Sequence, residues 1–437
     1  MSAAQQPAAA APFTGGHEVR RVLLSSILGT AVEWYDFLIY AVATTLVFNR
    51  LFFPSSDPGL SSIVGFGTYG VGFFARPLGA ALFGHFGDRI GRKAMLATTI
   101  VIMGVGTFLI GLLPTYAQIG LAAPVLLVAL RFLQGIGLGG EWGGAVLMVV
   151  ENAGPRSRGM LGAMVQMGNP IGNLAAIGVF ALVARMPEQE FLAWGWRVPF
   201  LVSILLVGVG LFIRLRLQET PAFRSLEARR QVARTPIIEV FTTHRRPFLI
   251  AVGLKVSEIT WASIAGVFVI TYATGKLGLP RAGILNALLL ASLIALFTIP
   301  LYGWLSDALG RRAMFFSSCL FSVLFAFPLF WLLDTRNMTL VTLAIVLGIN
   351  CGQMVGFSVG APWYSELFPT RLRYTGASLG FQIGAALSGG LTPLIAASLM
   401  AWSGGATWPI ALYLIACALL TALATLLAPE TARQPIG

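Results

Sequence analysis

Seven charged side chains stand inside long apolar stretches of this 437-residue chain. They are Glu33, Asp36, Arg76, Arg131, Glu141, Lys255 and Glu258. A charge is costly in an apolar interior, so such residues by default mark the path of an ion or a polar ligand. A carboxylate without a partner there is driven toward its protonated form, whereas a nearby guanidinium favours the charged form. A carboxylate that alternates between the two settings can load and release a proton.

The spacing of these residues groups them by depth. Glu33 and Asp36 are three residues apart and share one helix face. A rise of ~1.5 Å per residue brings Asp36 level with Arg131 near one membrane face, and Glu33 level with Arg76 and Glu141 nearer the middle. We expect Glu33 or Asp36 to carry the proton, with Arg131 as the switching partner and Glu141 in the same coupling set. The alternative is a permanent ion pair that only holds helices together.

An anionic ligand would need a cation in the same region, and Arg76 or Lys255 could bind its carboxylate. Glu258 follows Lys255 by three residues, so the alternative for these two is an ion pair within one helix. Hydrogen-bonding and aromatic side chains could complete the site. These candidates are Trp34, Tyr35, Trp142, Gln166, Asn169, Asn350 and Gln353. Taken singly, each could instead make a helix–helix hydrogen bond or an aromatic packing contact.

The composition shows which kind of element positions these residues. Hydrophobic residues make up 57% of the chain and charged residues 11%, against roughly 25% charged in soluble domains. Apolar stretches of ~20 residues recur throughout, which excludes a soluble enzyme. The net charge of +12 resides in short loops, so it indicates membrane topology and not nucleic-acid binding. The three cysteines have no metal or disulfide spacing, and we expect neither a metal nor a cofactor.

Hydropathy predicts an all-α integral membrane protein with twelve spans. The expected spans are 22–48, 61–85, 95–113, 122–150, 160–184, 198–217, 248–273, 282–305, 313–333, 339–363, 375–400 and 408–428. Alternate loops and the two ends hold twenty Lys and Arg residues, against six in the remaining loops. The positive-inside rule therefore predicts that both termini are cytoplasmic. The first 19 residues have no basic signal region and are expected to form a disordered cytoplasmic tail.

The chain repeats itself, which divides it into two related halves. Gly84, Asp88, Gly91, Arg92 and Lys93 recur as Gly303, Asp307, Gly310, Arg311 and Arg312. Glu151, Arg156 and Arg158 recur as Glu366, Arg371 and Arg373, and Glu219-Thr220 recurs as Glu430-Thr431. We therefore expect six-helix bundles over 20–217 and 248–428, a cytoplasmic linker over 218–247 and a C-terminal tail over 429–437. In such parallel repeats the substrate site lies between the halves.

The repeated motif identifies a family. GHFGDRIGRKAML after the second span resembles the signature of the major facilitator superfamily, and RFLQGIGLGGEWGGA resembles its Arg-x-x-Gln-Gly motif. VEWYDFLIYA, FFARPLGA, GGEWGG and GWRVPF look like the metabolite:proton symporters of bacterial inner membranes, which carry shikimate, 2-oxoglutarate, citrate, dicarboxylates, proline and betaine. VFNRLFFP, EQEFLAWGWRVPF and GLPRAGILN look most like the shikimate permease branch. Lys255 stands where that branch tends to have Arg, and Lys binds a carboxylate as a point charge.

The resemblance also implies that the loop motif is a gate that locks the cytoplasmic side. Asp88 could bind a helix N-terminus across the bundles, and Arg92 could pair with Glu151. The expected gate residues are Gly84, Asp88, Arg89, Gly91, Arg92, Lys93, Glu151, Arg156, Asp307, Arg311, Glu366 and Arg371. The alternative is a solvated basic loop that only sets topology.

No nucleophile stands with a base, so we do not expect an enzyme. The expected function is proton-coupled uptake of a small organic acid such as shikimate, by a monomer in the lipid bilayer without a nucleic-acid partner. The alternatives are symport of a dicarboxylate, 2-oxoglutarate, citrate, betaine or proline, or drug or metabolite efflux by proton antiport. GAMVQMGNPIGN in the fifth span is an incomplete form of the motif of drug antiporters.

Overall fold

The computed structural model describes residues 16–54, 58–154, 156–183, 185–216, 218–228 and 233–434, and this part of the chain folds into helices without a strand. Residues 16–19, which we expected in the disordered tail, belong to the first helix. The remainder of that predicted tail lies outside the described residues.

The first half of the chain forms a bundle of six membrane-crossing segments. Its long helices are α1 (Gly16–Ala43), α3 (Pro58–Ile90), α4 (Arg92–Leu112), α6 (Ala122–Val150), the pair α7 (Arg158–Val165) and α8 (Gly168–Val183), and α10 (Val198–Leu215). Short helices connect them: α2 (Asn49–Leu51), α5 (Tyr116–Ile119), α9 (Glu188–Ala193) and a 3₁₀ turn at Gly195–Arg197.

The second half repeats this arrangement. Its helices are α13 (Arg245–Ser263), α14 (Val269–Thr271), α15 (Arg281–Leu309), α16 (Arg311–Asp334), α17 (Met338–Leu347), α18 (Met354–Glu366), α19 (Arg373–Gly384), α20 (Thr392–Trp402) and α21 (Trp408–Leu427). The linker holds two helices that hydropathy did not predict, α11 (Pro221–Ala228) and α12 (Pro236–Thr242), and a 3₁₀ turn at Thr370–Leu372 precedes α19.

Eleven helical segments within the described residues are long and apolar enough to cross a membrane. The 33-residue α3 packs beside them along α6 and completes the twelve expected spans. Their outer surfaces carry exposed side chains such as Phe297, Leu205 and Trp331. Large apolar side chains facing outward all round a bundle are typical of contact with lipid.

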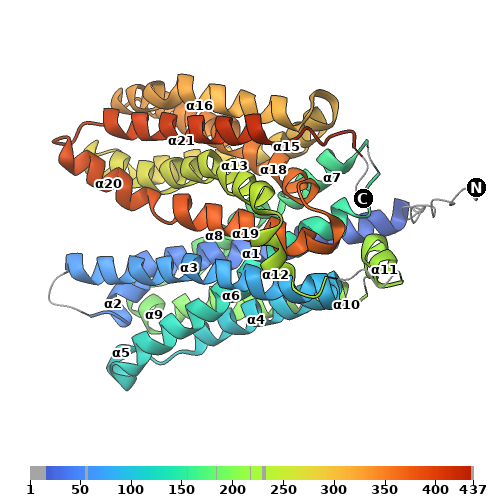
Figure 1. Cartoon of the computed structure of the whole chain (residues 1–437). Coiled ribbons are helices and arrows are strands. Elements are labelled where there is room, and N and C mark those ends of the chain that lie inside the picture. Colours follow the sequence, from blue (N-terminus) through green and yellow to red (C-terminus); the bar gives the residue numbers. More distant parts are fainter. Residues whose placement is uncertain are drawn as a thin grey trace, which may run out of the picture.

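The two bundles pack side by side, and the start of α1 and the described segment after α21 lie on one face of the molecule (Figure 1). We call this the terminal face; α3 ends there at Ile90 and α19 begins there at Arg373. The bundles meet along α3 with α19 and along α7 with α15 and α18. These three helix pairs place the loop motifs of both halves at the interface.

Several crossing segments widen locally into π-helix. These stretches are Thr44–Phe48, Ile264–Phe268, Tyr272–Lys276, Gly348–Gln353 and Ala385–Gly389. A π-helical turn inserts one extra residue per turn, and it is frequent where a helix lines a functional site. Four of the five belong to the second half, so the two bundles differ in their interiors.

Candidate functional site

Apart from the loop-motif networks at the terminal face, eight charged side chains are buried inside the spans in the described part of the chain. Four are basic and four acidic: Arg76, Arg131, Arg214 and Lys255, and Glu33, Asp36, Glu141 and Glu258. Six of them come from α1, α3, α6 and α10 of the first bundle, and only α13 contributes from the second. The charges therefore balance, and they concentrate in the first half.

Asp36 and Arg131 belong to one hydrogen-bonded chain. The hydroxyl of Thr107 donates to Asp36 Oδ2 at 2.7 Å. Gln134 Nε2 lies 2.6 Å from that hydroxyl, and Arg131 Nη1 donates to Gln134 Oε1 at 3.4 Å. The guanidinium of Arg131 also lies 4.1 Å from the centre of the Tyr40 ring, a cation–π contact. The expected proximity of Asp36 and Arg131 is present, but two polar side chains mediate it.

The sequence did not lead us to expect Thr107 and Gln134 as the residues that connect Asp36 to Arg131. Gln134 stands within the Arg-x-x-Gln-Gly motif, three residues after Arg131, and this spacing was a usable signal. Thr107 offered none, because a threonine commonly bonds its own helix backbone within a span.

Glu141 lies near Glu33, as expected, and it pairs with Arg214, a partner that the sequence did not indicate. The Arg214 guanidinium binds both carboxylate oxygens, with Nη1 at 2.7 Å from Oε2. Thr99 donates to the same oxygen at 2.8 Å. Gly29 of α1 faces this pair, and a Cβ at Gly29 would overlap the Arg214 guanidinium. Arg214 lies in the last turn of α10, near the end of the expected span 198–217, and its long side chain reaches inward.

Glu33 differs from the other buried acids. Its side chain is 4% exposed, and within the described residues it accepts no hydrogen bond. Charged groups surround it on four neighbouring helices. They are Arg76 on α3, Glu141 on α6, Arg214 on α10 and Lys255 on α13. Glu33 is thus the point where the charges of the two bundles meet.

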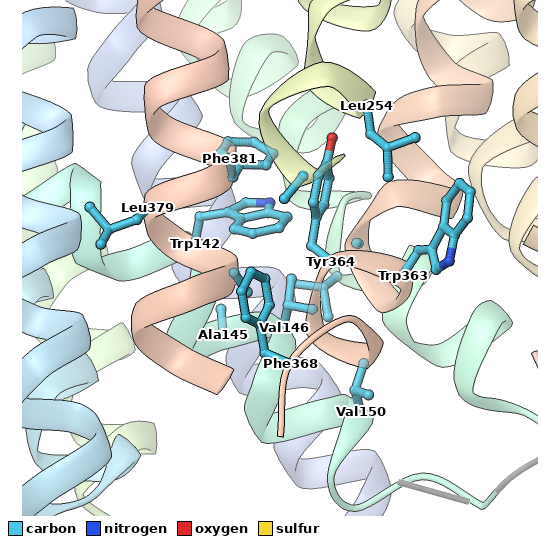
Figure 2. Packing of buried hydrophobic residues seen from close by; sticks show 14 of the residues in the cluster. Trp142, Ala145, Val146, Val150, Leu254, Trp363, Tyr364, Phe368, Leu379 and Phe381 are labelled. Atoms are coloured by element: carbon cyan, nitrogen blue, oxygen red, sulfur yellow. The ribbon is translucent and has the colours of Figure 1, made fainter. Parts of the chain in front are cut away.

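Lys255 forms an ion pair with Glu258 one turn further along α13, the geometry of the intrahelical alternative. Its ammonium lies 3.6 Å from the centre of the Phe381 ring. The other side of that ring stacks on Trp142 of α6, with centroids 3.7 Å apart and planes at 19°. Figure 2 shows the Trp142 and Phe381 rings lying against each other beside Tyr364. An aromatic layer thus connects Lys255 to the first bundle.

Arg76 lies among aromatic rings from α1 and α3. Its guanidinium is 4.5 Å from the centre of Phe73 and 5.0 Å from the centre of Phe37. Trp34 packs edge-on against Phe37 and, across the interface, against Phe357 of α18. Trp34, half-buried, therefore lies where the two bundles meet, as a ligand-contacting residue must.

Two expected ligand residues point elsewhere, which corrects their assignment. Tyr35 is buried in the core of the first bundle, where its hydroxyl donates to the Pro199 carbonyl at 2.8 Å. Asn350 uses its amide within the second bundle, donating to Ala291 and accepting from Thr298. Hydrogen bonds inside each bundle already occupy both side chains, so neither presents a polar group to the interface.

The remaining polar candidates are closer to the interface. Gln166 donates to the Phe357 carbonyl across it at 3.2 Å. Asn169 accepts from Asn173, one turn further along α8, at 3.4 Å. Gln353 lies in a π-helical stretch, is 7% exposed, and makes no hydrogen bond to any residue the structure describes.

At the terminal face, Asp88 of the first bundle binds the N-terminus of α19. Its carboxylate accepts from the Tyr374 and Thr375 amides at 3.2 and 2.9 Å. A helix N-terminus attracts an anion through its unpaired amides and its dipole. A Cβ at Gly84, one turn earlier, would lie 2.7 Å from Thr375 Cα, so only glycine permits this approach.

The second half makes the same contact in the reverse direction. The Asp307 carboxylate accepts from the Gly159 and Met160 amides, which open α7, at 2.8 and 2.9 Å. A Cβ at Gly303 would lie 2.5 Å from that of Ala163. The repeat in the sequence thus appears as two reciprocal carboxylate–helix contacts between the bundles.

Each contact is flanked by a buried ion network. Arg92 donates to Thr370 O at 2.9 Å and lies 3.4 Å from Glu151, which Arg373 also binds at 3.2 Å. In the second half Arg311 binds Glu366 at 3.2 Å and Asp307 at 3.0 Å, with Arg158 3.9 Å from Glu366. The expected pairing of Arg92 with Glu151 is present.

Three expected gate residues lie outside these networks. Arg89 is exposed and contacts His85, Arg156 is exposed in a turn, and Arg371 pairs with Glu239 of the linker. Arg158 and Arg373, which also recur in the repeat, take the buried positions, because each begins a helix that faces the other bundle. Gly91, with φ of 123°, and the Lys93 amide, which donates to Glu219, shape the start of α4.

Comparison with known proteins agrees with this architecture. The family model described as Major Facilitator Superfamily matches residues 27–382. The shikimate transporter of Escherichia coli (strain K12) is 40% identical over 417 residues, 95% of each chain. The inner membrane metabolite transport protein YhjE of the same organism is 41% identical, over 97% of each chain. The glycine betaine/proline/ectoine/pipecolic acid transporter OusA of Dickeya dadantii is 35% identical, over 96% of this chain and 85% of its own length.

Solved structures show the same fold at low identity. The proton:xylose symporter XylE bound to 6-bromo-6-deoxy-D-glucose superposes with a TM-score of 0.78, at 18% identity over 96% of this chain and 98% of that one. XylE in its inward open conformation gives 0.65. The relatives are transporters and not enzymes. The chain is a multi-pass membrane transporter and belongs to the major facilitator superfamily, among its metabolite transporters.

Proposed function

We propose that this protein takes up a small organic acid together with a proton, by alternating access, with shikimate as the first candidate substrate. The observation that carries the proposal is the balanced set of buried acids and bases that converges where the two bundles meet. Buried charges are costly and persist where a transported ion or substrate requires them. The 40% identity to a shikimate transporter supports the choice of substrate.

The proton site lies on α1, at Asp36 or Glu33, with Arg131 as the partner of the charged form. The Thr107 and Gln134 side chains give Asp36 and Arg131 a connection that can tighten or loosen as helices tilt. The substrate carboxylate binds near Arg76 and Lys255. Trp34 and Gln353 contact the rest of the substrate. Trp34 lies at the interface between the bundles, and Gln353 makes no hydrogen bond to a described residue.

The terminal face is the cytoplasmic face, given the bias of Lys and Arg toward its loops. The structure therefore represents the state in which the cytoplasmic side is closed. The Asp88 and Asp307 contacts are the locks of this state, and both must break before the substrate leaves toward the cytoplasm. Because each lock joins the two bundles, the bundles open by rocking against each other.

A zwitterion such as betaine is the second candidate substrate. The Lys255–Glu258 pair presents both charges on α13, and the relative OusA is named for betaine, proline, ectoine and pipecolic acid. A zwitterion carries no net charge, so it has no need of two cations, whereas Arg76 and Lys255 both act near Glu33. We rank it below a carboxylate for that reason.

The test is uptake into proteoliposomes with a more acidic exterior. The panel is labelled shikimate, quinate, protocatechuate, 2-oxoglutarate, citrate and betaine, with protein-free vesicles as the control. A carboxylate should accumulate above its outside concentration, and a protonophore should abolish this. Accumulation of betaine alone, or release of substrate driven by inward proton flow, would contradict the proposal.

A further inference from the structure

The four buried acids do not hold their charges equally. Asp36 accepts a hydrogen bond from Thr107, Glu141 accepts from Arg214 and Thr99, and Glu258 pairs with Lys255. Protonating any of these would break an existing hydrogen bond or ion pair, because a protonated carboxyl accepts less strongly.

Glu33 has no such contact to lose. Its Oε2 is buried and meets no donor in the described part of the chain. The charges around it are opposed, with Arg76, Arg214 and Lys255 favouring its anion and Glu141 disfavouring it. Arg214 is already bound through both carboxylate oxygens of Glu141. Arg76 on α3 is the strongest of the cations that act on the Glu33 charge, and Lys255 on α13, itself paired with Glu258, is the cation from the second bundle.

An arriving carboxylate changes this balance. Away from the loop-motif networks at the terminal face, the buried set of the described spans contains four positive and four negative groups, so this set is neutral when all are ionised. A substrate anion bound near Arg76 and Lys255 would leave one excess negative charge. An uncompensated charge in a low-dielectric interior costs several kcal/mol. Neutralising Glu33 with a proton restores a neutral set and removes the Glu33 charge from the field of Arg76 and Lys255, so that a substrate carboxylate can take its place.

We propose that Glu33 is the proton site coupled to the substrate, and that a substrate carboxylate replaces its charge as the counter-ion of Arg76 and Lys255. This inference rests on the proposed function and makes it more specific. One proton enters with one carboxylate, so the loaded and empty sites carry the same net charge. The substrate class is accordingly a monocarboxylate, since a dicarboxylate would leave a second negative charge buried.

The first test measures substrate binding to the purified full-length protein as a function of pH. The probe is labelled shikimate, or quinate or protocatechuate if the uptake panel shows that one of these is carried instead. Wild-type affinity should fall about tenfold per pH unit once Glu33 ionises, as linkage to one proton requires. In Glu33→Gln, whose neutral amide mimics the protonated acid, affinity should change less than twofold over the same range.

Asp36→Asn is the matched control on the same helix face, and it should retain the pH dependence of binding. Glu33→Gln should also exchange labelled for unlabelled substrate across the vesicle membrane while losing uphill accumulation, which shows that the variant is folded. The reverse pattern, in which Asp36→Asn alone loses the pH dependence, would overturn the assignment and place the proton on Asp36.

The second test separates the driving forces. With equal pH on both sides, an inside-negative potassium diffusion potential should leave monocarboxylate uptake unchanged within twofold, whereas a proton gradient should drive it. Stimulation or inhibition of uptake by the potential would refute the entry of one proton with one carboxylate. Uptake of only 2-oxoglutarate or citrate would refute this inference while leaving organic-acid symport intact. Absence of any carboxylate uptake would refute both.

Discussion

At the scale of single residues, the buried charges of this protein are compensated at short range. Arg214 and Glu141 illustrate this, because neither is more than 2% exposed and the pair has further bonds to Thr99 and Leu96. Removing one partner of such a pair leaves a charge buried without compensation, which costs more than removing both. This asymmetry distinguishes a structural ion pair from a transport site.

Glu141→Gln should lower the free energy of unfolding by about 3–5 kcal/mol, the range for breaking a buried pair. Glu141→Gln combined with Arg214→Met should recover a large part of this loss. Thermal unfolding in a mild detergent, followed by tryptophan fluorescence, measures both. Equal destabilisation in the single and double variants would contradict a mainly structural pair.

Pairs of residues that the spacing along a helix or the helix rise brings together could be predicted from the sequence. Lys255 with Glu258 follows from a three-residue spacing, and Asp36 with Arg131 from helix rise alone. Arg214 could not be predicted, because hydropathy cannot tell a side chain that reaches into the bundle from one that reaches water. The inward orientation of Tyr35 likewise depends on the rotation of α1, which one aromatic residue does not determine.

At the scale of elements, glycines control how closely helices of different bundles approach. Gly84 on α3 and Gly303 on α15 occupy equivalent positions of the repeat, and both face backbone of the other bundle. Contacts this close hold Asp88 and Asp307 against their helix N-termini. Any side chain at these glycines must therefore separate the bundles at the terminal face.

Gly84→Leu should shift the protein toward the state that is open at the terminal face. Uptake should slow by on the order of tenfold, which corresponds to a change of about 1.4 kcal/mol in the free-energy difference between the closed and the open state. Spin labels at Arg89→Cys and Leu309→Cys, both exposed on that face, report the separation once the native cysteines are replaced. The distance distribution should move to longer values. Gly208→Leu is the control, because nothing lies within 4 Å of a Cβ there. An unchanged distribution in Gly84→Leu would contradict the role of close packing.

Hydropathy predicted the crossing helices well, since a span needs only enough consecutive apolar residues. It could not predict the π-helical stretches such as Gly348–Gln353, which depend on packing between helices. The linker helices α11 and α12 were missed because, at eight and seven residues, they are too short to give a hydropathy signal. The repeat located the contacts between the bundles, yet it could not say which arginine of Arg156 and Arg158 is buried.

At the scale of the whole molecule, the C-terminal segment Pro429–Gln434 joins the terminal face to both bundles. The Glu430 carboxylate accepts from the Arg311 and Arg312 amides at 3.0 Å, and the Arg158 guanidinium of the first bundle binds the Gln434 carbonyl. Burial raises the pKa of Glu430, but these amide donors and those of Thr431 and Ala432 outweigh burial and lower it below its usual value.

A lowered pKa in the folded protein means that Glu430 contributes stability above its unfolded pKa of about 4.3, and that this is lost as pH falls through the folded value. A spin label at Arg433→Cys should therefore be immobile from neutral pH down to about pH 5 and become mobile in stronger acid. Glu430→Gln should make it mobile at neutral pH. Glu188→Gln, which removes an exposed ion pair with Arg50, should change nothing. A label that stays immobile in Glu430→Gln would contradict the anchoring.

The central claim is that the buried acids couple proton entry to carboxylate entry. The most direct measurement is the external pH of weakly buffered proteoliposomes when shikimate is added without any imposed gradient. The medium should become more alkaline with the wild-type protein, and Glu33→Gln should take up shikimate down its gradient without a pH change. Shikimate entry into wild-type vesicles with no alkalinisation, or with acidification, would contradict it.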